Sequence, residues 1–269
     1  MGSICRFARV FHIDASPAER YTVAYRSHCD LPMIAPLPRT DGPLATLLDS
    51  EQIAIAEIDP QLVTAGAGLF PEEAASVANA VETRRKQFTA GRVLARDAWQ
   101  RLGVPAQPLL NDEQRVPRWP AGIVGTITHT QGWCAAAVAK DTELAALGAD
   151  VEAATPLERG LWERICRPAE RRLLESSPER GGLMGKAFFS AKESIYKALY
   201  PSVRVFLDFQ SMQIDLEQLA EGKYRWHAEL QVDWGRFRRG QRFGPGVLGI
   251  DPSWILTGIA LPLGSLNEN

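Results

Sequence analysis

The chain has 269 residues, of which 45% are hydrophobic and 23% charged, and its formal net charge is −2. This composition is typical of a globular protein with one large or two small domains. A net charge this close to zero does not favour general binding to nucleic acid. We therefore expect no nucleic-acid partner and only local basic sites.

The cysteine spacing and the hydrophobic runs indicate a reducing environment away from membranes. No Cys-x-x-Cys pair occurs, which favours free thiols over a disulfide framework or a zinc site; the four cysteines are Cys5, Cys29, Cys134 and Cys166. No apolar run approaches the ~18 residues that a membrane span needs. Asp14 and Glu19 interrupt any signal peptide. We therefore predict a cytoplasmic location and no membrane span.

Residues 1–45 alternate short apolar runs with turn-forming residues, which predicts two short strands and a proline-rich connector. We expect His12 and His28, which lie in these runs, to be packed or exposed and not ligands. From residue 71 to residue 103 the pattern becomes helical, beginning with Pro-Glu-Glu and ending with Gly. Arginines line one side of this helix, and for Arg96 and Arg101 we expect an ordinary solvated face.

Two strand-like runs, residues 132–140 and 143–152, follow the segment GTITHT at residues 125–130. Only a short charged turn separates the two runs, which predicts an antiparallel pair. In the second run, period-two alternation puts Asp150 and Glu152 on one face and the apolar residues on the other. This pairing would bring Thr128 and His129 near the two carboxylates. Taken alone, the two acids fit equally well as solvated side chains at a strand end.

Residues 188–201 predict a buried amphipathic helix that carries three charges. Glu193 and Lys197 are four residues apart and share a helix face, whereas Lys192 lies about 100° round the helix from Glu193. A surface ion pair contributing ~0.3 to 0.5 kcal/mol would explain Glu193 and Lys197 without any function. If Glu193 instead faces Asp150 and Glu152, the three carboxylates form an oxygen site suited to magnesium.

The remaining segments read as further helices and strands. Residues 155–180 predict one or two helices, and alternating stretches predict strands at 203–216, 224–237 and 253–261. Because each half of the chain supplies strands together with a helix, the predicted fold class is α+β.

Four segments, in the same order, resemble the 4′-phosphopantetheinyl transferases of the branch that serves siderophore, non-ribosomal peptide and polyketide synthases. The segments are RRKQFTAGRVLAR at 84–96, GTITHTQGWCAAAVA at 125–139, GADVE at 148–152 and FSAKESIYKA at 189–198. They lie within residues 82–201, and the first eighty residues match nothing so specifically. Ala149 departs from the bulkier aliphatic residue that the family more often has there, which affects packing and not the charged positions.

The resemblance implies a particular architecture. It implies a monomer of two similar α/β halves, related by a pseudo-twofold axis, with coenzyme A bound in the cleft between them. We accordingly predict an N-terminal half at residues 1–143, which carries the nucleotide contacts, and a C-terminal half at residues 144–269, which carries the metal site and the catalytic helix.

The resemblance also implies which residues contact coenzyme A. They are Arg84, Arg92, Thr128, His129 and Lys192. Arg85 is an alternative to Arg84, Arg115 is a further candidate in a loop, and Lys192 could touch the carrier protein instead. The charged residues 170–172 would offer a surface to the carrier protein, or form a plain exposed face.

The implied reaction transfers 4′-phosphopantetheine from coenzyme A to a serine of an acyl or peptidyl carrier protein and releases adenosine 3′,5′-bisphosphate. Magnesium held by Asp150, Glu152 and Glu193 would neutralise the pyrophosphate oxygens. Glu193 would take the serine proton, directly or through a water, and Lys197 would stabilise the transferred phosphate.

Two other functions are consistent with the same residues. One is a magnesium-dependent phosphodiester hydrolase, against which the basic helix and the Thr128 and His129 segment count, because they suit a 3′-phosphorylated nucleotide. The other is a non-catalytic homologue that binds coenzyme A or a carrier protein. A decayed homologue would be expected to have lost Glu193 or Lys197, and both are present.

Overall fold

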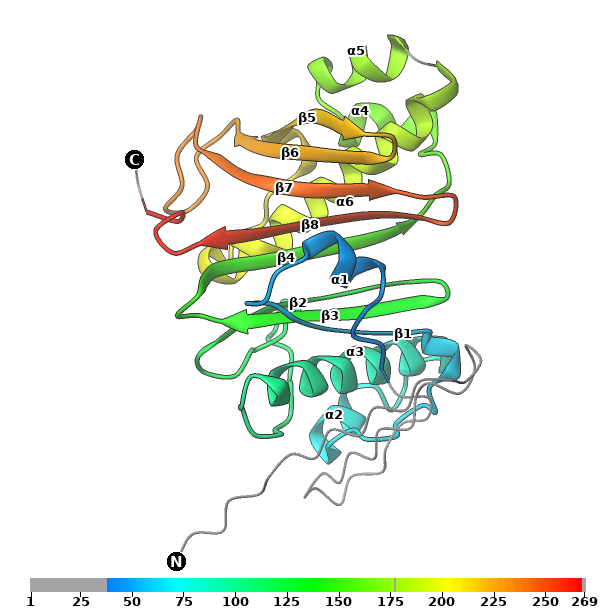
Figure 1. Cartoon of the computed structure of the whole chain (residues 1–269), viewed down its shortest axis with the longest axis vertical. Helices are drawn as coiled ribbons and strands as arrows, with labels where there is room; N and C mark the ends of the chain where they lie inside the picture. Colours follow the sequence, from blue (N-terminus) through cyan, green and yellow to red (C-terminus); the bar gives the residue numbers. More distant parts are fainter. Residues whose placement is uncertain (1–37, 177, 268–269) are drawn as a thin grey trace, which may run out of the picture. The chain divides into compact units, whose positions relative to one another are not determined.

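A computed structural model describes residues 38–176 and 178–267, all of which belong to one compact unit. The strands expected before residue 38 lie outside the described residues, and so do His12, His28, Cys5 and Cys29. The fold is α+β, as expected, with two antiparallel sheets (Figure 1). In the described ranges no helix combines the length and the hydrophobicity that crossing a membrane would require.

The elements follow one another in the order shown in Figure 1. The helices are α1 (Pro43–Leu48), α2 (Pro71–Ser76), α3 (Glu82–Arg101), α4 (Trp162–Ile165), α5 (Pro168–Ser176) and α6 (Pro178–Val203), with short 3-10 turns η1 (Pro60–Leu62), η2 (Arg159–Leu161) and η3 (Phe209–Ser211). The strands are β1 (Ala54–Ile58), β2 (Ile123–Thr130), β3 (Trp133–Lys140), β4 (Leu144–Ala153), β5 (Met212–Ala220), β6 (Lys223–Leu230), β7 (Arg242–Ile250) and β8 (Trp254–Pro262).

The first sheet has the strand order β1-β3-β2, and α3 packs against one of its faces. The buried face of α3 and the facing strands form one apolar cluster, which includes Leu94, Trp99, Ile123 and Val138. The single helix predicted for residues 71–103 is wrong, because α2 ends at Ser76 and α3 begins at Glu82. Across this break, Glu73 of α2 turns inward and pairs with Arg96 of α3, with 2.9 Å between Oε1 and Nη1.

The same ion pair corrects the expectation for Arg96. This side chain is not solvated: it is buried and donates to Glu73, to the carbonyl of Gly68 and to that of Gln107. Glu73 also accepts from the backbone N–H of Leu109. Helical spacing located Arg96 beside other arginines, but it could not show that α2 covers that part of the helix.

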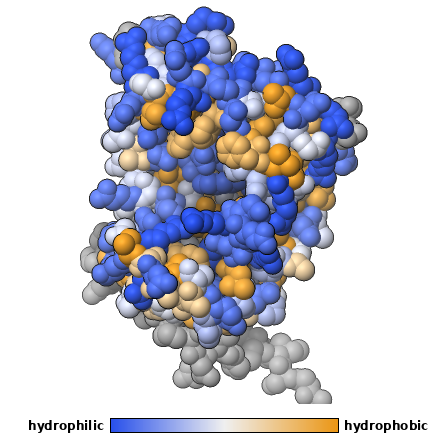
Figure 2. Space-filling model, turned by 180° about the vertical axis from the view of Figure 1, so that it is seen from behind, coloured by the Kyte–Doolittle hydropathy of each residue, from blue (hydrophilic) through white to orange (hydrophobic). Residues whose placement is uncertain are grey.

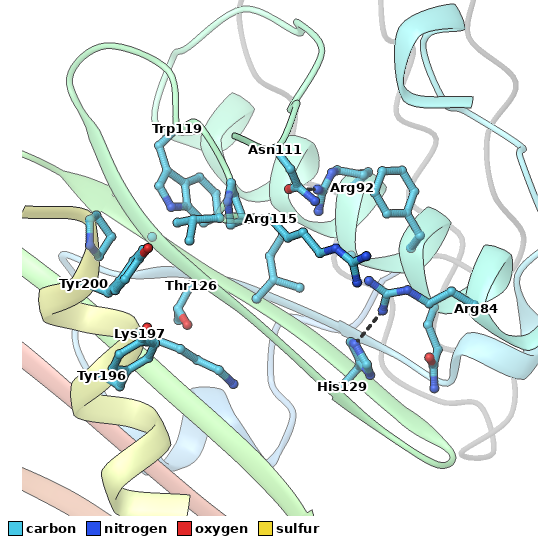
Figure 3. Close-up of a pocket in the computed structure, with 18 residues that line it drawn as sticks. Arg84, Arg92, Asn111, Arg115, Trp119, Thr126, His129, Tyr196, Lys197 and Tyr200 are labelled. Atoms are coloured by element: carbon cyan, nitrogen blue, oxygen red, sulfur yellow. Dashed lines mark hydrogen bonds between the residues drawn. The ribbon is translucent and has the colours of Figure 1, made fainter. Parts of the chain in front are cut away.

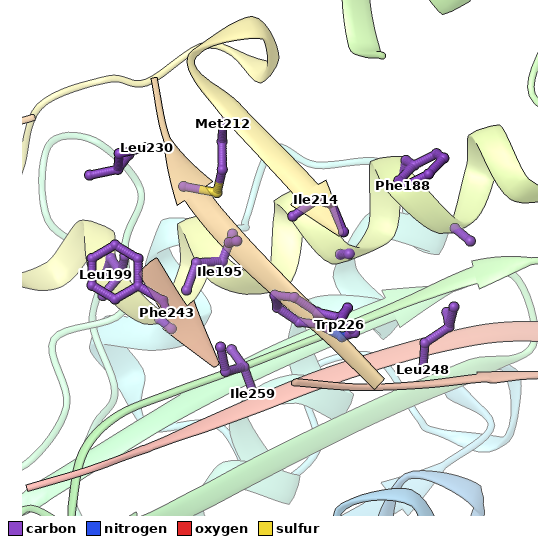
Figure 4. Close-up of a cluster of buried hydrophobic side chains, with 14 of the residues drawn as sticks. Phe188, Ile195, Leu199, Met212, Ile214, Trp226, Leu230, Phe243, Leu248 and Ile259 are labelled. Atoms are coloured by element: carbon purple, nitrogen blue, oxygen red, sulfur yellow. The ribbon is translucent and has the colours of Figure 1, made fainter. Parts of the chain in front are cut away.

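The second sheet has the order β4-β8-β7-β6-β5, and α6 lies against β4 and β8. Apolar side chains of α6, including Ile195 and Leu199, face Trp226, Phe243 and Ile259 of the sheet (Figure 4). The helix approaches β4 so closely that a Cβ added at Gly148 would lie 2.0 Å from the carbonyl oxygen of Ser194. Only glycine allows this approach, and Lys186 and Lys197 of α6 reach Glu152 and Asp150 of β4.

Three strand predictions require correction. The residues that end the stretch expected at 203–216 form β5, which begins only at Met212. The strand expected at 224–237 is β6, which ends at Leu230, and β7 was not predicted. β7 contains Pro245, which normally argues against a central strand. Here the β6–β7 register shifts between Trp226 and Ala228, and the β7–β8 pairing begins only at Gly246, so the missing N–H of Pro245 breaks no ladder bond.

The antiparallel pairing predicted between residues 132–140 and 143–152 is also wrong. β3 and β4 belong to different sheets, and β4 instead lies beside β2, as Figure 1 shows. The contact uses threonine hydroxyls in place of a backbone ladder: the N–H of Ala149 donates to Thr126 Oγ1 at 3.2 Å, and that of Val151 donates to Thr128 Oγ1 at 3.0 Å. The segment at Thr128 and His129 therefore does lie near Asp150, although through a different arrangement.

The alternation predicted for residues 143–152 is confirmed. Leu147, Ala149 and Val151 belong to an apolar cluster with Leu44 of α1, on the face of β4 that is turned away from α6. This cluster also contains Ala135 and Ala137 of β3, so it continues from one sheet into the other. Asp150, on the opposite face, points toward α6.

The predicted division at residue 143 falls in the turn between β3 and β4, where the chain passes from the first sheet to the second. The pseudo-twofold relation between the halves stays a prediction.

Candidate active site

A cavity of about 240 Å³ opens between α3, β2 and the C-terminal part of α6 (Figure 3). The segment between α3 and β2 closes it from a fourth side, through Asn111, Arg115 and Trp119. Residues from both predicted halves therefore line the same space.

The face opposite to that of Figure 1 is mainly hydrophilic, with smaller hydrophobic groups near its middle (Figure 2).

Positive charge dominates the lining of this cavity. Arg84 and Arg92 reach it from α3, Arg115 from the loop and Lys197 from α6. The described lining contains no aspartate or glutamate. Such a lining attracts an anion that can accept several hydrogen bonds, such as a phosphate group.

Arg84 and His129 meet at one end of the cavity, with 3.2 Å between Nη1 and Nε2. Arg85 is not among the lining residues, so the geometry favours Arg84 of the two alternatives. Burial lowers the pKa of His129 below its ordinary value, and the nearby charges of Arg84 and Lys197 lower it further. Asp150 opposes this shift. His129 is therefore a neutral hydrogen-bonding group near pH 7.

Arg92 is the buried arginine of the site, with 5% of its surface exposed. Its guanidinium donates to Asn111 Oδ1 and lies 4.2 Å above the centre of the Phe88 ring. Its Nε is buried and has no partner among the described residues. Burial is the main reason why the pKa of Arg92 falls to about 10. A buried donor without a partner, on a cation that lines a cavity, fits a ligand oxygen.

Asp150 is held rigidly at the contact between β4 and α6. Its Oδ1 lies 2.6 Å from Lys197 Nζ, and its Oδ2 accepts from the hydroxyl of Ser190 at 2.8 Å. The hydroxyls of Ser190 and Ser194 both contact Thr257 Oγ1 of β8, at 2.8 and 2.7 Å. This buried network fixes the orientation of the carboxylate.

Glu152 and Glu193 are held differently from Asp150. Glu152 pairs with Lys186, with 3.2 Å between Oε2 and Nζ, whereas Glu193 has no hydrogen bond or ion pair within the part of the chain that the structure describes. Burial raises the pKa of Glu193, and the charges of Asp150 and Glu152 raise it further against the opposing effect of Lys197. The pKa of Glu152 is raised as well, first by burial and then by Asp150.

Glu193 opens into a second, smaller cavity of about 60 Å³. Phe206, Leu207 and Phe209 are among its lining residues. Tyr196 lines this cavity as well as the cationic one, so the two cavities have one residue in common.

The three predicted metal ligands fit a magnesium ion by their chemistry. They are hard oxygen donors whose charges act on one another, because Asp150 and Glu152 both raise the pKa of Glu193, and a cation would relieve this repulsion. Within the described ranges, however, no three such side chains stand close enough together to hold a metal ion. Lys197 and Lys186 neutralise Asp150 and Glu152 in this arrangement.

Thr128 and Lys192 do not line the cationic cavity. Thr128 is 2% exposed and its hydroxyl serves the contact with β4, accepting from Val151 and donating to Asp150 Oδ1 at 3.4 Å. Lys192 is 3% exposed and pairs with Glu170 on the other side of α6. Both side chains are committed to these contacts, so the coenzyme A contacts expected for them stay predictions that would require the contacts to break. Thr126, which precedes Thr128 by two residues on the same strand, lines the cavity instead.

Glu170 also corrects the expected partner surface at residues 170–172. Its side chain is 1% exposed and therefore belongs to the interior. Arg171 keeps a partly exposed side chain and pairs with Glu163.

Several residues that line the cavity were not predicted from the sequence, among them Asn111, Trp119, Tyr196 and Tyr200. Tyr196 and Tyr200 stand four residues apart within the charged helix, a spacing that places them on one face. This spacing is visible in the sequence, but it is equally typical of a helix face that packs in a hydrophobic core. Nothing in the sequence marked Asn111 or Lys186.

Two family models match the chain, one for each predicted half. The model described as "4'-phosphopantetheinyl transferase N-terminal domain" matches residues 72–139, and that described as "4'-phosphopantetheinyl transferase superfamily" matches residues 146–240. The cationic stretch of α3 lies in the first match, and Asp150, Glu152 and Glu193 lie in the second.

Curated relatives agree with the family models. The chain is 43% identical over 151 residues to 4′-phosphopantetheinyl transferase Svp of Streptomyces mobaraensis, a match that covers 55% of this chain and 61% of that protein. It is 34% identical to PptT of Mycobacterium tuberculosis, over 64% of this chain and 75% of the relative. It is 30% identical to enterobactin synthase component D of Escherichia coli, over 54% and 69%.

Proposed function

Because the chain belongs to the 4′-phosphopantetheinyl transferase superfamily, an enzyme family, we propose that it transfers 4′-phosphopantetheine from coenzyme A to a serine hydroxyl of a carrier protein. The observation that carries this proposal is the pair of cavities that share Tyr196, one cationic and one containing Glu193. A phosphate donor suits the first cavity, and a hydroxyl acceptor suits the second.

Coenzyme A is the donor that the cationic cavity favours. Its phosphates would contact the guanidinium groups of Arg84, Arg92 and Arg115. The buried Nε of Arg92, which has no partner among the described residues, would donate a hydrogen bond to one of the phosphate oxygens. His129, beside Arg84, can donate or accept one hydrogen bond to the same group. Lys197 lies where the cavity meets α6, on the side nearest to Asp150.

In the reaction, the serine oxygen forms a bond to the β-phosphorus of coenzyme A while the bond to adenosine 3′,5′-bisphosphate breaks. Glu193 takes the serine proton, directly or through a water. It suits this role because no other described side chain occupies its carboxylate, which is therefore open to a hydroxyl that enters the cavity. Lys197 stabilises the charge on the transferred phosphate.

Asp150, Glu152 and Glu193 are the residues that would hold magnesium. The ion would supply positive charge to the pyrophosphate oxygens. For this, Lys186 and Lys197 would have to move away from the carboxylates with which they pair. Both lysines have flexible side chains that remain partly exposed, at 18% and 28%, so such a movement requires no change of the backbone.

The proposal extends to partners and location. One of the relatives named above suggests the partner class: its name, enterobactin synthase component D, favours carrier domains of siderophore, peptide or polyketide synthases. We further propose a monomer in the cytoplasm whose two halves, 1–143 and 144–269, are related by a pseudo-twofold axis.

The direct test is intact-mass spectrometry of an apo carrier protein incubated with this protein, coenzyme A and magnesium. We expect a mass gain of one phosphopantetheine group and equimolar adenosine 3′,5′-bisphosphate. Release of the bisphosphate without modification of any carrier would identify a hydrolase instead. Binding of coenzyme A with neither product would identify a non-catalytic homologue.

A further inference from the structure

Lys192 is next to Glu193 in the chain, but its ammonium group points toward α4, α5 and η3. It donates to the carbonyl of Ile165 at 2.7 Å, to Glu170 Oε2 at 2.8 Å and to the carbonyl of Phe209 at 3.0 Å. An ammonium group has three N–H donors, so all of them are used. The side chain is 3% exposed and cannot reach a ligand without breaking these bonds.

Glu170 completes the junction from the opposite side. Its Oε1 accepts from the backbone N–H of Ile214 at 2.7 Å, and its Oε2 accepts from that of Arg167 at 2.7 Å. The Lys192–Glu170 pair therefore joins α6 to the end of α4, to the start of α5, to η3 and to β5. Each of these elements would otherwise bury an unpaired backbone or charged group.

Lys192, but not Glu170, also lines the cavity that contains Glu193. Lys192, Phe209 and Met212 line this cavity together with Glu193 and Tyr196. Holding the carbonyl of Phe209 fixes the segment opposite Glu193, and anchoring Lys192 fixes the rotation of α6 about its axis. Since Glu193 follows Lys192 by about 100° round the helix, that rotation decides where its carboxylate points.

We propose that Lys192 and Glu170 are positioning residues that orient Glu193 and shape the acceptor cavity, and that Lys192 does not bind coenzyme A. The inference rests on the proposed function in so far as Glu193 acts in the reaction. Two buried charges that satisfy five hydrogen bonds specify one arrangement of helix and strand, which an apolar pair of the same size would not do.

The test compares Lys192→Met, Glu170→Gln and the double variant in the full chain. Lys192→Met leaves Glu170 buried and unpaired, so we expect kcat per folded molecule to fall by about tenfold or more, with the Kd of coenzyme A within about threefold of the wild type. The double variant removes the unpaired charge, and its amide can still accept from Ile214. We expect it to recover at least about threefold in kcat over Lys192→Met.

A second measurement does not depend on activity. In Lys192→Met, amide hydrogen exchange should accelerate in residues 209–214, whereas the β8 amides should keep the wild-type rate. The Glu73→Gln variant is a matched control, because Glu73 belongs to another buried ion pair, with Arg96, outside both cavities. It should lower the melting temperature without changing kcat per folded molecule.

Three results would overturn the inference. They are a rise in the Kd of coenzyme A of tenfold or more in Lys192→Met, a kcat per folded molecule that is unchanged in it, and exchange in residues 209–214 that stays at the wild-type rate. If the wild-type protein modifies no carrier, the proposed function fails, and the exchange measurement still decides whether the pair holds residues 209–214. Should Lys192→Met not fold, Glu170→Gln is measured in its place and should lower kcat with the same unchanged Kd.

Discussion

Glu193 differs from its two acidic neighbours in how it is held. Asp150 and Glu152 each have a lysine partner, whereas Glu193 has no partner among the described residues and opens into a cavity. Its raised pKa follows from burial and from the two nearby carboxylates. A carboxylate in this state accepts a proton more readily than a paired one, which is the physical basis for assigning it the role of base.

The Glu193→Gln variant should lose transfer activity while keeping its fold. We expect kcat to fall by about 10²- to 10⁴-fold, because a glutamine cannot accept the serine proton. The measurement is the initial rate of carrier modification, with circular dichroism to check folding. Glu217→Gln is the control, since Glu217 is an exposed acid of β5 outside both cavities, and its rate should stay within about threefold. A Glu193→Gln rate within about tenfold of wild type would disprove the assignment.

The Arg92→Ala variant should weaken binding of coenzyme A. A charge-assisted hydrogen bond contributes about 1.5 to 3 kcal/mol, so we expect the Kd to rise by roughly 10- to 100-fold in calorimetry. Arg85→Ala is the matched control, because Arg85 belongs to the same helix but does not line the cavity. Equal effects of the two variants would mean that α3 contributes only a general positive field.

His129 should make the protein less stable in acid. Its pKa is lowered in the folded state, so below about pH 6.5 the unfolded chain binds the proton more readily than the native state. The free energy of unfolding therefore falls as the pH drops below about 6.5, and this loss is absent at higher pH. Urea unfolding at neutral and mildly acidic pH should show a smaller acid-induced loss for His129→Gln than for the wild type. An equal loss in both proteins would contradict this prediction.

At the scale of elements, the contact between α6 and β4 brings the acids and lysines together. Gly148 permits the close approach, and the threonine hydroxyls of β2 hold β4 from its other edge. Hydrogen bonds from Ser190 and Ser194 to Thr257 join α6 to β8. The carboxylate of Asp150 is consequently placed by three elements that are distant in the sequence.

The Gly148→Ala variant should destabilise this contact. The added Cβ would lie 2.0 Å from the carbonyl oxygen of Ser194, so α6 must shift. We expect the free energy of unfolding to fall by about 1 to 3 kcal/mol, measured by urea denaturation. Gly160→Ala is the control, because a Cβ there meets no atom within 4 Å, and it should change stability by less than about 0.5 kcal/mol. Similar losses in both variants would show that α6 adjusts without strain.

At the scale of the whole described unit, the cations suited to a phosphate donor line one cavity, and Glu193 lines a second cavity that shares Tyr196 with the first. The cations come from α3, the following loop and the end of α6, and the carboxylates come from β4 and the middle of α6. Binding of coenzyme A and its chemical transfer should therefore be separable.

Removal of divalent metal should abolish transfer but retain binding. With a chelator present, we expect no mass gain on the carrier protein, while calorimetry still detects coenzyme A in the cationic cavity. Added magnesium should restore the mass gain. Transfer that continues at its full rate in the chelator would show that Asp150, Glu152 and Glu193 act without a metal ion.

The sequence by itself determined the family, the fold class and most of the charged residues of the site. Charged side chains at helical or alternating spacing, such as Glu193 with Lys197 and Asp150 with Glu152, reflect local geometry that the chain carries in its own periodicity. The α+β class and the opposite faces of residues 143–152 followed from the same periodicity and are confirmed.

Only the tertiary structure decided what each side chain touches. In the sequence, Arg96 has the spacing of a solvated arginine and Lys192 that of a ligand-binding lysine. In the structure, Arg96 is buried in an ion pair with Glu73 of α2, and Lys192 in an ion pair with Glu170 of α5. The pairing of β4, the strand at Pro245 and the role of Thr128 depend on which segments meet in space. Burial and long-range pairing are properties of distant segments, and local residue patterns contain little information about them.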